Sequence, residues 1–391
     1  MNAARARRPR GRDRQLLRVD EFGRISSHTH RDLPSLLRAG DLVVANDAAT
    51  LPASLTGVHV PSGAAIEVRL AFRSGAALPA TSENVMGRPG PPEPGFTAIV
   101  FGAGDYRTRT EDRPAPPTLR AGDALLIASL RARVVGINGH PRLIELEFEH
   151  SAAETWEGLA RHGRPIQYAH VPQPLALWDT WTSIAARPVA FEAPSAGFLL
   201  DWSMLSDLRR RGVRFSTLTH AAGISSTGDP ALDAHLPFDE PYVIPSSTAV
   251  LIELTKAEGG RVVAIGTTVV RALEHAARKD GHVAAGPGLA TGRLGRDTRL
   301  RVVDAIVSGV HETDTSHYEL LRAFQRDDVL ARATVEAEAK DYLAHEFGDA
   351  VLIVRSGSGV TLVADEWPVA SEMRQVERAV SAEPYLAAGA K

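Results

Sequence analysis

Histidine and glutamate side chains, which can transfer a proton near neutral pH, occur close to strand ends in the second half of this chain. His220 and His311 each follow a stretch with strand character, and Glu240 comes shortly after His235 in a proline-rich loop. Ligands of α/β folds collect outside the carboxyl ends of strands, so His220, His311 and Thr267 could converge there. Each lone histidine could equally be an ordinary surface or core residue, and these residues alone leave both possibilities open.

A second candidate is the turn in RVVAIGTTVVRALEHAARKDG (261–281), which predicts a short strand, a Gly-Thr-Thr turn and a helix. Either Thr267 or Thr268 can cap that helix. Free backbone N–H groups at a helix start favour a phosphate or a carboxylate, so we expect a small anionic group at this turn. Any α/β protein has several such turns, so an ordinary structural turn is the alternative.

Composition excludes several classes of chemistry. The 391 residues contain no cysteine, which excludes disulfides, thiolate catalysis and cysteine-built metal sites. No dinucleotide-binding glycine motif follows a strand, and there is neither a P-loop lysine motif nor a serine-esterase elbow. The formal charge of −3 predicts no overall attraction to nucleic acid, although the basic segments 5–18 and 209–214 could bind it locally. With no apolar run of membrane-spanning length and no signal-peptide core, we expect a cytoplasmic protein without a membrane partner.

The pattern of elements that must position these residues changes along the chain. Seven short strand-like stretches lie between residues 41 and 149 and predict a small barrel or sandwich, interrupted by a Pro/Gly-rich loop at 86–95. After residue 151 helices and strands alternate, which is typical of an α/β fold. The pattern therefore predicts a strand-rich domain and an α/β domain, with 1–14 and 371–391 as flexible termini.

Eight stretches in order resemble the S-adenosylmethionine:tRNA ribosyltransferase-isomerase family of queuosine biosynthesis. Together they extend over roughly residues 12–355. They are GDLVVAND (40–47) with Pro52, AIEVRL (65–70), APSAG (193–197), the series His235, Glu240, Ile244 and Pro245, AIGTTVVRALE (264–274), VVDAIVSGVH (302–311), Ala323 with Phe324, and FGDAVLI (347–353).

The resemblance implies that the ribosyl part of S-adenosylmethionine is transferred to the aminomethyl group of a 7-deazaguanine base at the tRNA wobble position. Adenine and methionine leave, and the ribose is rebuilt as an epoxycyclopentane. S-adenosylmethionine is a co-substrate, and no metal or redox cofactor is implied. The family's fold is similarly an α/β domain with an inserted β-barrel. The resemblance therefore implies an α/β main domain at 15–50 and 151–370 with an inserted small β-barrel domain at 51–150. The family suggests a monomer.

The resemblance also implies roles for particular residues. The sulfonium acidifies the neighbouring ribose carbon, so a base must take that proton and an acid should help adenine depart; the catalytic candidates are Glu240, His235 and His311. Arg271 could hold an anion or pair with Glu274 at i+3. Asp304 and Glu67 could bind ribose hydroxyls or an amine, or be ordinary buried polar residues. The remaining binding candidates are Asn46, Asp47, Pro194, Ser195, Gly197, His220, Gly266, Thr267 and Thr268.

Some positions depart from the family's pattern. Ala49 and Ser54 stand where the family has arginines, Leu199 where it has a histidine, and Phe238 where it has the second histidine of a paired series. Loss of arginines weakens phosphate contacts, and loss of polar side chains from a pocket changes acceptor recognition or removes catalysis. Two alternatives to the family's reaction therefore stay open: a diverged enzyme that uses S-adenosylmethionine with a non-tRNA acceptor, and a catalytically silent member that binds the nucleoside or RNA.

Overall fold

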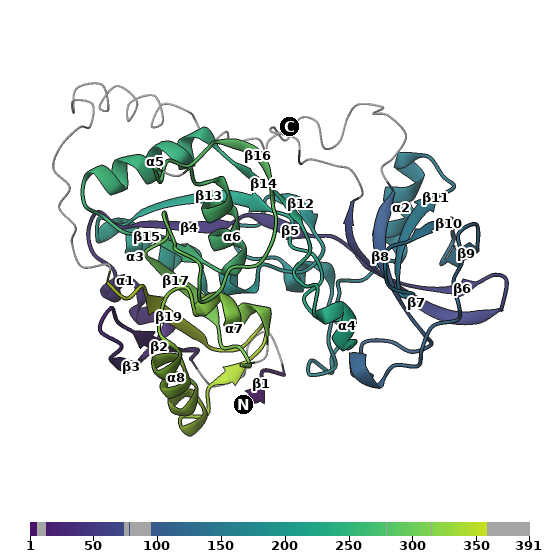
Figure 1. Ribbon diagram of the computed structural model, residues 1–391, viewed down its shortest axis with the longest axis horizontal. Helices are drawn as coiled ribbons and strands as arrows, with labels where there is room; N and C mark the ends of the chain where they lie inside the picture. The colour runs from purple at the N-terminus through teal and green to yellow at the C-terminus, as the bar shows by residue number, and fades with distance from the viewer. Residues whose placement is uncertain (6–12, 74–77, 79–94, 279, 314, 358–391) are drawn as a thin grey trace.

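The computed structural model describes residues 1–5, 13–73, 78, 95–278, 280–313 and 315–357. Two β structures dominate it: a nine-stranded mixed sheet carrying helices, and a closed six-stranded barrel that lies beside it (Figure 1). The barrel strands fall between two strands of the sheet in chain order, so the barrel is an insertion. The predicted fold class, an α/β main domain with an inserted small β-barrel, is confirmed.

The large sheet has a parallel centre. Strand β4 pairs in parallel with β13 on one side and with β15 on the other, and β15 pairs in parallel with β17. Four parallel strands therefore end at one edge of the sheet. The order across the sheet is β16 (Gly286–Ala290), β14 (Glu240–Ile244), β13 (Arg214–His220), β4 (Leu42–Asn46), β15 (Val262–Ile265), β17 (Ala305–Gly309), β19 (Ala350–Val354), β2 (Gln15–Val19) and β3 (Ile25–Thr29).

Helices cover both faces of this sheet because its central strands are apolar on both faces. Alternate residues of a strand point to opposite faces, and in β4 Leu42 and Val44 belong to one core while Val43 and Ala45 belong to another. The first core also contains apolar residues of α5, α6 and α8, and the second contains those of α1 and α3. The helices are α1 (Leu33–Leu36), α2 (Ala152–His162), α3 (Trp202–Arg210), α4 (Pro230–Asp233), α5 (Ser246–Ala257), α6 (Thr267–Ala276), α7 (Ser316–Leu321) and α8 (Asp327–Ala339).

The barrel encloses a core of its own, built from the inward-facing residues of its antiparallel strands. Leu55, Val68 and Leu146 are fully buried members of this core. Around the barrel the order is β10 (Leu130–Ile137), β11 (Leu143–Phe148), β8 (Phe96–Phe101), β7 (Ala64–Arg73), β6 (Ser54–His59) and β9 (Ala124–Ile127), which closes on β10.

Smaller elements complete the described chain. Residues 2–3, which fall within the predicted flexible N-terminus, form strand β1 (Asn2–Ala3) and pair in parallel with β18 (Leu343–Ala344). Strands β5 (Ala48–Thr50) and β12 (Arg187–Ala190) form a second short parallel pair. Most of the predicted Pro/Gly-rich loop and the segment 371–391 lie outside the described residues. Among the helices that are described, none is both long enough and apolar enough to cross a membrane.

Candidate active site

A pocket lies at the edge where the four parallel strands end, and we call it the edge pocket. Strand β14 runs antiparallel to β13, so its first residue, Glu240, lies at the same edge as His220, the last residue of β13. Segments that are far apart in the sequence therefore meet here. Lining residues include Glu192, Pro194, Ser195, Gly223, Ser225, Glu240, Gly266, Thr267, Thr268, Arg271, Ser308, His311 and His317.

Gly266 makes the turn into α6 possible. Its φ of 96° and ψ of 157° lie in a region that essentially only glycine occupies. It is also the N-cap residue of α6, without a side-chain cap, so the prediction that Thr267 or Thr268 caps the helix is wrong. Both threonines lie in the first turn instead, where they line the pocket beside the backbone N–H groups of the helix start. An anionic group fits this position.

We expect Gly266→Ala to destabilise the protein. A Cβ at this position would be strained and would lie 3.3 Å from the Cβ of Ala196 in the facing turn. The strain corresponds to a loss of about 1–3 kcal/mol in the free energy of unfolding. Urea titration would measure this loss as a lower midpoint with an unchanged m-value. Gly136→Ala is the control, because a Cβ on Gly136 meets open space. Equal stability of the two variants would contradict the strain at Gly266.

Glu240 is the centre of a buried ionic network. It accepts hydrogen bonds from His220 Nε2 at 2.8 Å, from the backbone N–H of Gly223 at 2.7 Å and from Arg271 Nη1. Burial alone would raise the pKa of Glu240, but the hydrogen bond from His220 and the charges of His220 and Arg271 outweigh it and lower that pKa. Glu240 is therefore ionised at neutral pH and neutralises Arg271.

The alternative pairing of Arg271 with Glu274 does not occur. Glu274 instead accepts hydrogen bonds from the backbone N–H groups of Arg301, Val302 and Val303 at 2.7–3.0 Å. Arg271 turns toward β14 and β16, where its Nη2 also donates to the carbonyl of Ala290, the last residue of β16, at 3.0 Å. The anion that Arg271 holds is thus the protein's own carboxylate.

Asn46, at the end of β4, fixes the relative positions of the pocket elements. Its Nδ2 donates to the carbonyl of His220 at 2.9 Å, and its Oδ1 accepts from the His220 N–H at 3.0 Å. The same Nδ2 lies 3.4 Å from Thr268 Oγ1, which leaves the Thr268 proton for another acceptor. The carboxylate of Asp47 accepts hydrogen bonds from the hydroxyls of Thr217 and Thr219 at 3.0 and 2.6 Å, and burial raises the pKa of Asp47.

Two histidines stack in the wall of the edge pocket. The rings of His311 and His317 have centroids 4.8 Å apart and planes 15° apart, and His311 Nε2 lies 2.8 Å from Ser308 Oγ. Burial lowers the pKa of His311 well below its usual value, and the nearby His317 and His345 add to the effect. Burial also lowers the pKa of His317. Both rings are therefore neutral at neutral pH, and each has one ring nitrogen that can accept a hydrogen bond.

Glu192 is a pocket residue that sequence reasoning missed. Its carboxylate accepts a hydrogen bond from the Tyr168 hydroxyl, and burial raises its pKa to about 7 against the opposing effect of Ser225. Both protonation states are therefore populated near neutral pH, as proton transfer requires. The one sequence signal was its position directly before the APSAG stretch at 193–197. Burial, which raises the pKa, cannot be read from that position.

Seven predicted site residues lie outside the pocket lining: Asn46, Asp47, Glu67, Gly197, His220, His235 and Asp304. Glu67 is buried in the barrel, where it accepts from Arg69 Nε at 2.7 Å and from Arg113. Asp304 precedes β17, at the opposite end of the sheet, and accepts from the Val262 N–H and from Arg355 at 2.9 Å each. His235 is exposed, with Nδ1 2.7 Å from the carbonyl of Ala231.

Gly197 also lies outside the pocket lining, although Pro194 and Ser195 belong to it. A Cβ on Gly197 would lie 3.0 Å from Thr182 Cγ2, so its small size permits close packing behind the pocket wall. Within the described residues no group of three or more histidines, aspartates and glutamates is placed to hold a metal ion.

Comparison with known proteins gives consistent matches. A family model described as "Queuosine biosynthesis protein" matches residues 1–353. An S-adenosylmethionine:tRNA ribosyltransferase-isomerase of Anaeromyxobacter dehalogenans is 31% identical over 354 residues, which cover 89% of this chain and 94% of that protein. One of Thiobacillus denitrificans is 32% identical over 346 residues, covering 88% and 91%. A crystal structure of S-adenosylmethionine tRNA ribosyltransferase from Thermotoga maritima matches with 22% identity and a TM-score of 0.46, covering 90% of this chain and 96% of that one.

Proposed function

Since this chain belongs to the queuosine biosynthesis protein family, we propose that it is an S-adenosylmethionine:tRNA ribosyltransferase-isomerase whose reaction takes place in the edge pocket. One observation supports this location most strongly. Residues 194–195, 240, 266–271 and 311 come from four stretches that resemble the family, and residues of all four line this one pocket. S-adenosylmethionine is the co-substrate in this proposal, and tRNA carries the acceptor base.

The start of α6 is the binding position for an anionic group of the substrates. Gly266 allows close approach of the backbone, and Thr267 and Thr268 add hydroxyl groups. The methionine carboxylate and a nucleic-acid phosphate both match the free N–H groups there. The charge of Arg271 is not available to this anion because Glu240 neutralises it.

We assign proton transfer to Glu192, while the neutral His311, which also lines the pocket, can accept a hydrogen bond. In its carboxylate form Glu192 can take the proton from the ribose carbon beside the sulfonium, and in its acid form it can donate to the departing adenine. A bound sulfonium favours the carboxylate form because an opposite charge nearby lowers the pKa of an acid. Glu240 is fully engaged with His220, Arg271 and Gly223, so it positions the pocket elements instead of transferring a proton.

Four of the departures from the family's pattern lie outside the lining of the edge pocket. Leu199 is buried in the apolar core below the sheet, and Phe238 packs its ring 5.7 Å from that of Phe72. Ala49 is buried in β5, and Ser54 donates to Glu67 in the barrel at 2.8 Å. None of the four is among the described residues that line the edge pocket. These four departures therefore do not argue against an active enzyme.

Adenine release from S-adenosylmethionine tests the proposal. The purified chain should release adenine when tRNA with a 7-aminomethyl-7-deazaguanine wobble base is present, as measured by chromatography. Release without tRNA would indicate a different acceptor or hydrolysis. Binding of S-adenosylmethionine without any release would indicate a silent member. Either result would contradict the proposed function.

Thr268→Ala is expected to raise the KM for S-adenosylmethionine about ten- to a hundredfold. The hydroxyl is placed to donate to a charged group of the substrate, and such a hydrogen bond contributes about 1.5–3 kcal/mol. Adenine-release kinetics would measure the change, and thermal unfolding would check that the fold is retained. Thr334→Ala is the control, because its hydroxyl bonds only the Leu330 carbonyl of its own helix in the described structure. Equal KM values for the two variants would remove Thr268 from the site.

A further inference from the structure

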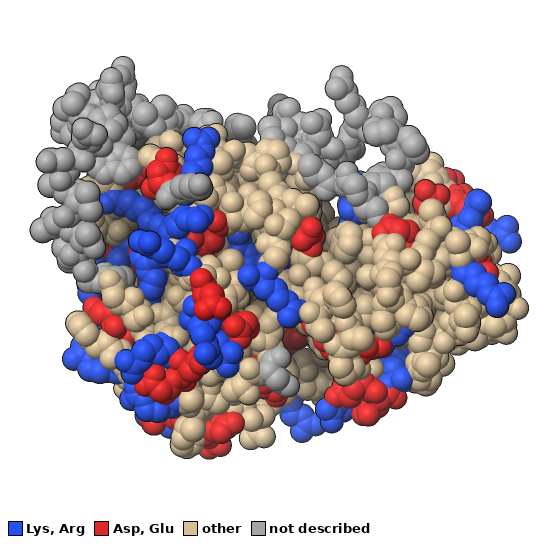
Figure 2. All heavy atoms as spheres, in the orientation of Figure 1, with Lys and Arg blue, Asp and Glu red and all other residues tan. Residues whose placement is uncertain are grey.

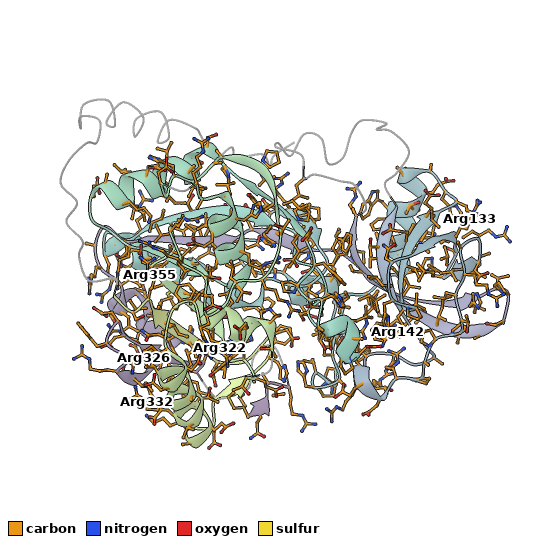
Figure 3. The ribbon with its side chains drawn as sticks, in the orientation of Figure 1. Arg133, Arg142, Arg322, Arg326, Arg332 and Arg355 are labelled. Atoms are coloured by element: carbon orange, nitrogen blue, oxygen red, sulfur yellow. The ribbon has the colours of Figure 1, made fainter. Side chains whose placement is uncertain are left out.

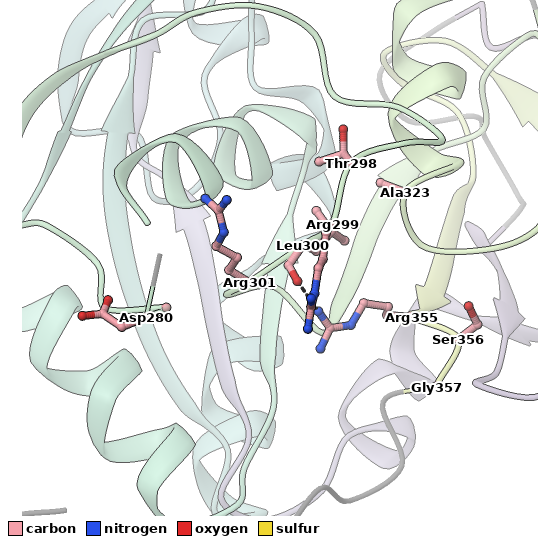
Figure 4. A pocket seen from close by; sticks show the side chains of 10 residues that line it. Asp280, Thr298, Arg299, Leu300, Arg301, Ala323, Arg355, Ser356 and Gly357 are labelled. Atoms are coloured by element: carbon pink, nitrogen blue, oxygen red, sulfur yellow. Dashed lines mark hydrogen bonds between the residues drawn. The ribbon is translucent and has the colours of Figure 1, made fainter. Parts of the chain in front are cut away.

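A second cavity, of about 750 Å³, lies at the end of the large sheet opposite the edge pocket. Three arginines line it: Arg299 and Arg301 precede β17, and Arg355 directly follows β19 (Figure 4). We call this cavity the arginine pocket. It lies in the main domain, in the region of Arg355 labelled in Figure 3.

The arginine pocket carries uncompensated positive charge. Arg355 is held in place by Asp304 at 2.9 Å and by the carbonyl of Leu300 at 2.8 Å. By contrast, the exposed guanidinium groups of Arg299 and Arg301 have no acidic partner within the described part of the chain. Among the described lining residues Asp280 is the acidic one. Lys256, whose Nζ donates to the Arg301 carbonyl at 2.9 Å, adds a further positive charge beside the pocket.

A polyanionic substrate needs such charges because the edge pocket does not supply them. Arg271 is the one arginine among the described residues lining the edge pocket, and Glu240 neutralises it. The chain as a whole has a formal charge of −3, so RNA can be attracted only by local basic surfaces. The predicted basic segment 209–214 is partly neutralised, since Arg210 pairs with Asp207 and Arg214 with Glu258.

The two pockets are separated by the length of β17. Arg301 lies before this strand and His311 after it, and five strand residues span about 17 Å at about 3.3 Å per residue. An RNA stem with one base in the edge pocket can therefore present backbone phosphates at the other end of the sheet. Figure 2 shows Lys and Arg side chains gathered over the left half of the main domain in this view.

From this arrangement we propose that the arginine pocket binds the phosphodiester backbone of the tRNA substrate, away from the reacting nucleotide. Arg299 and Arg301 donate to phosphate oxygens, and Arg355 shapes the pocket wall. Guanidinium groups suit this task because their planar donors match phosphate geometry. The inference rests on the proposed function, which supplies the RNA substrate.

The double variant Arg299→Ala/Arg301→Ala tests the inference. We expect the KM for modified tRNA to rise about tenfold and the slope of log KM against log salt to fall by about 1–2, because phosphate contacts are lost. The kcat at saturating tRNA and the KM for S-adenosylmethionine should be unchanged. Arg326→Ala is the matched control: it also removes an exposed arginine of the main domain, but Asp328 neutralises that arginine at 2.8 Å.

The outcomes separate this inference from the proposed function. If the wild-type chain releases no adenine with modified tRNA, the proposed function fails. If the wild type is active and the double variant keeps both its tRNA KM and its salt slope, the arginine pocket does not bind RNA. Calorimetry with inorganic phosphate tests whether the arginine pocket binds a free phosphate instead of RNA. If the wild type binds phosphate, the double variant does not, and the tRNA kinetics of the two are the same, the pocket is a free-phosphate site and the inference is overturned.

Discussion

Glu192→Gln is expected to lower kcat for adenine release by about 10²- to 10⁴-fold, the range that a positioned acid or base contributes. Glutamine keeps the size of the side chain and can still accept the Tyr168 hydrogen bond, but it cannot take up a proton. The loss should therefore appear in turnover and not in stability. Steady-state kinetics and thermal unfolding would measure the two quantities separately. Glu157→Gln, on the exposed face of α2, is the control for removing a carboxylate.

The pH dependence gives an independent check on Glu192. Burial raises its pKa to about 7, and the base must be deprotonated to act. The pH dependence of kcat/KM reports the pKa values of the free enzyme. In the wild type, kcat/KM should therefore fall as the pH drops through about 7. Tyr168→Phe removes a hydrogen-bond donor that favours the carboxylate form of Glu192, so the pKa of Glu192 should rise. The acidic limb of the kcat/KM profile should then move to higher pH. An unchanged limb in Glu192→Gln would assign the titration to another group.

Arg271→Met is expected to lower the free energy of unfolding by about 3–5 kcal/mol. The substitution leaves the Glu240 carboxylate buried without the charge of Arg271, and breaking a buried ion pair costs about this much. Urea titration at pH 7 would measure the loss. Because the folded state lowers the pKa of Glu240, its stabilising effect is present above the unfolded pKa near 4.5 and is lost as the pH falls through the folded pKa.

The double variant Arg271→Met/Glu240→Gln is the control for this prediction. It removes both charges, so it should be more stable than Arg271→Met alone, although His220 then loses its carboxylate acceptor. Arg161→Met breaks an exposed pair with Glu157 and should change stability by no more than about 1 kcal/mol. A double variant as unstable as Arg271→Met would show that Arg271 stabilises the fold through packing and its carbonyl contacts.

Much of the fold could be predicted from local patterns. Val262, Val263 and Ile265 do form a strand, and Gly266 does make the turn into a helix, because apolar periodicity and glycine act over a few residues. The predicted strands around residues 213–220 and 350–354 appear as β13 and β19. Capping was the weaker inference: both Thr267 and Thr268 are good capping residues, yet Gly266 takes the N-cap position.

The sequence by itself determined the α/β alternation, the strand-rich segment and the polar residues that follow the parallel strands, because each depends on neighbouring residues. Only the tertiary structure decided what those polar residues do. Glu192 gains its raised pKa from burial, which outweighs the opposing hydrogen bonds of Ser225 and Tyr168, residues of two other segments. Arg271 pairs with Glu240, 31 positions away, and not with Glu274 on its own helix. Charge interactions depend on distance and desolvation, and folding alone sets both.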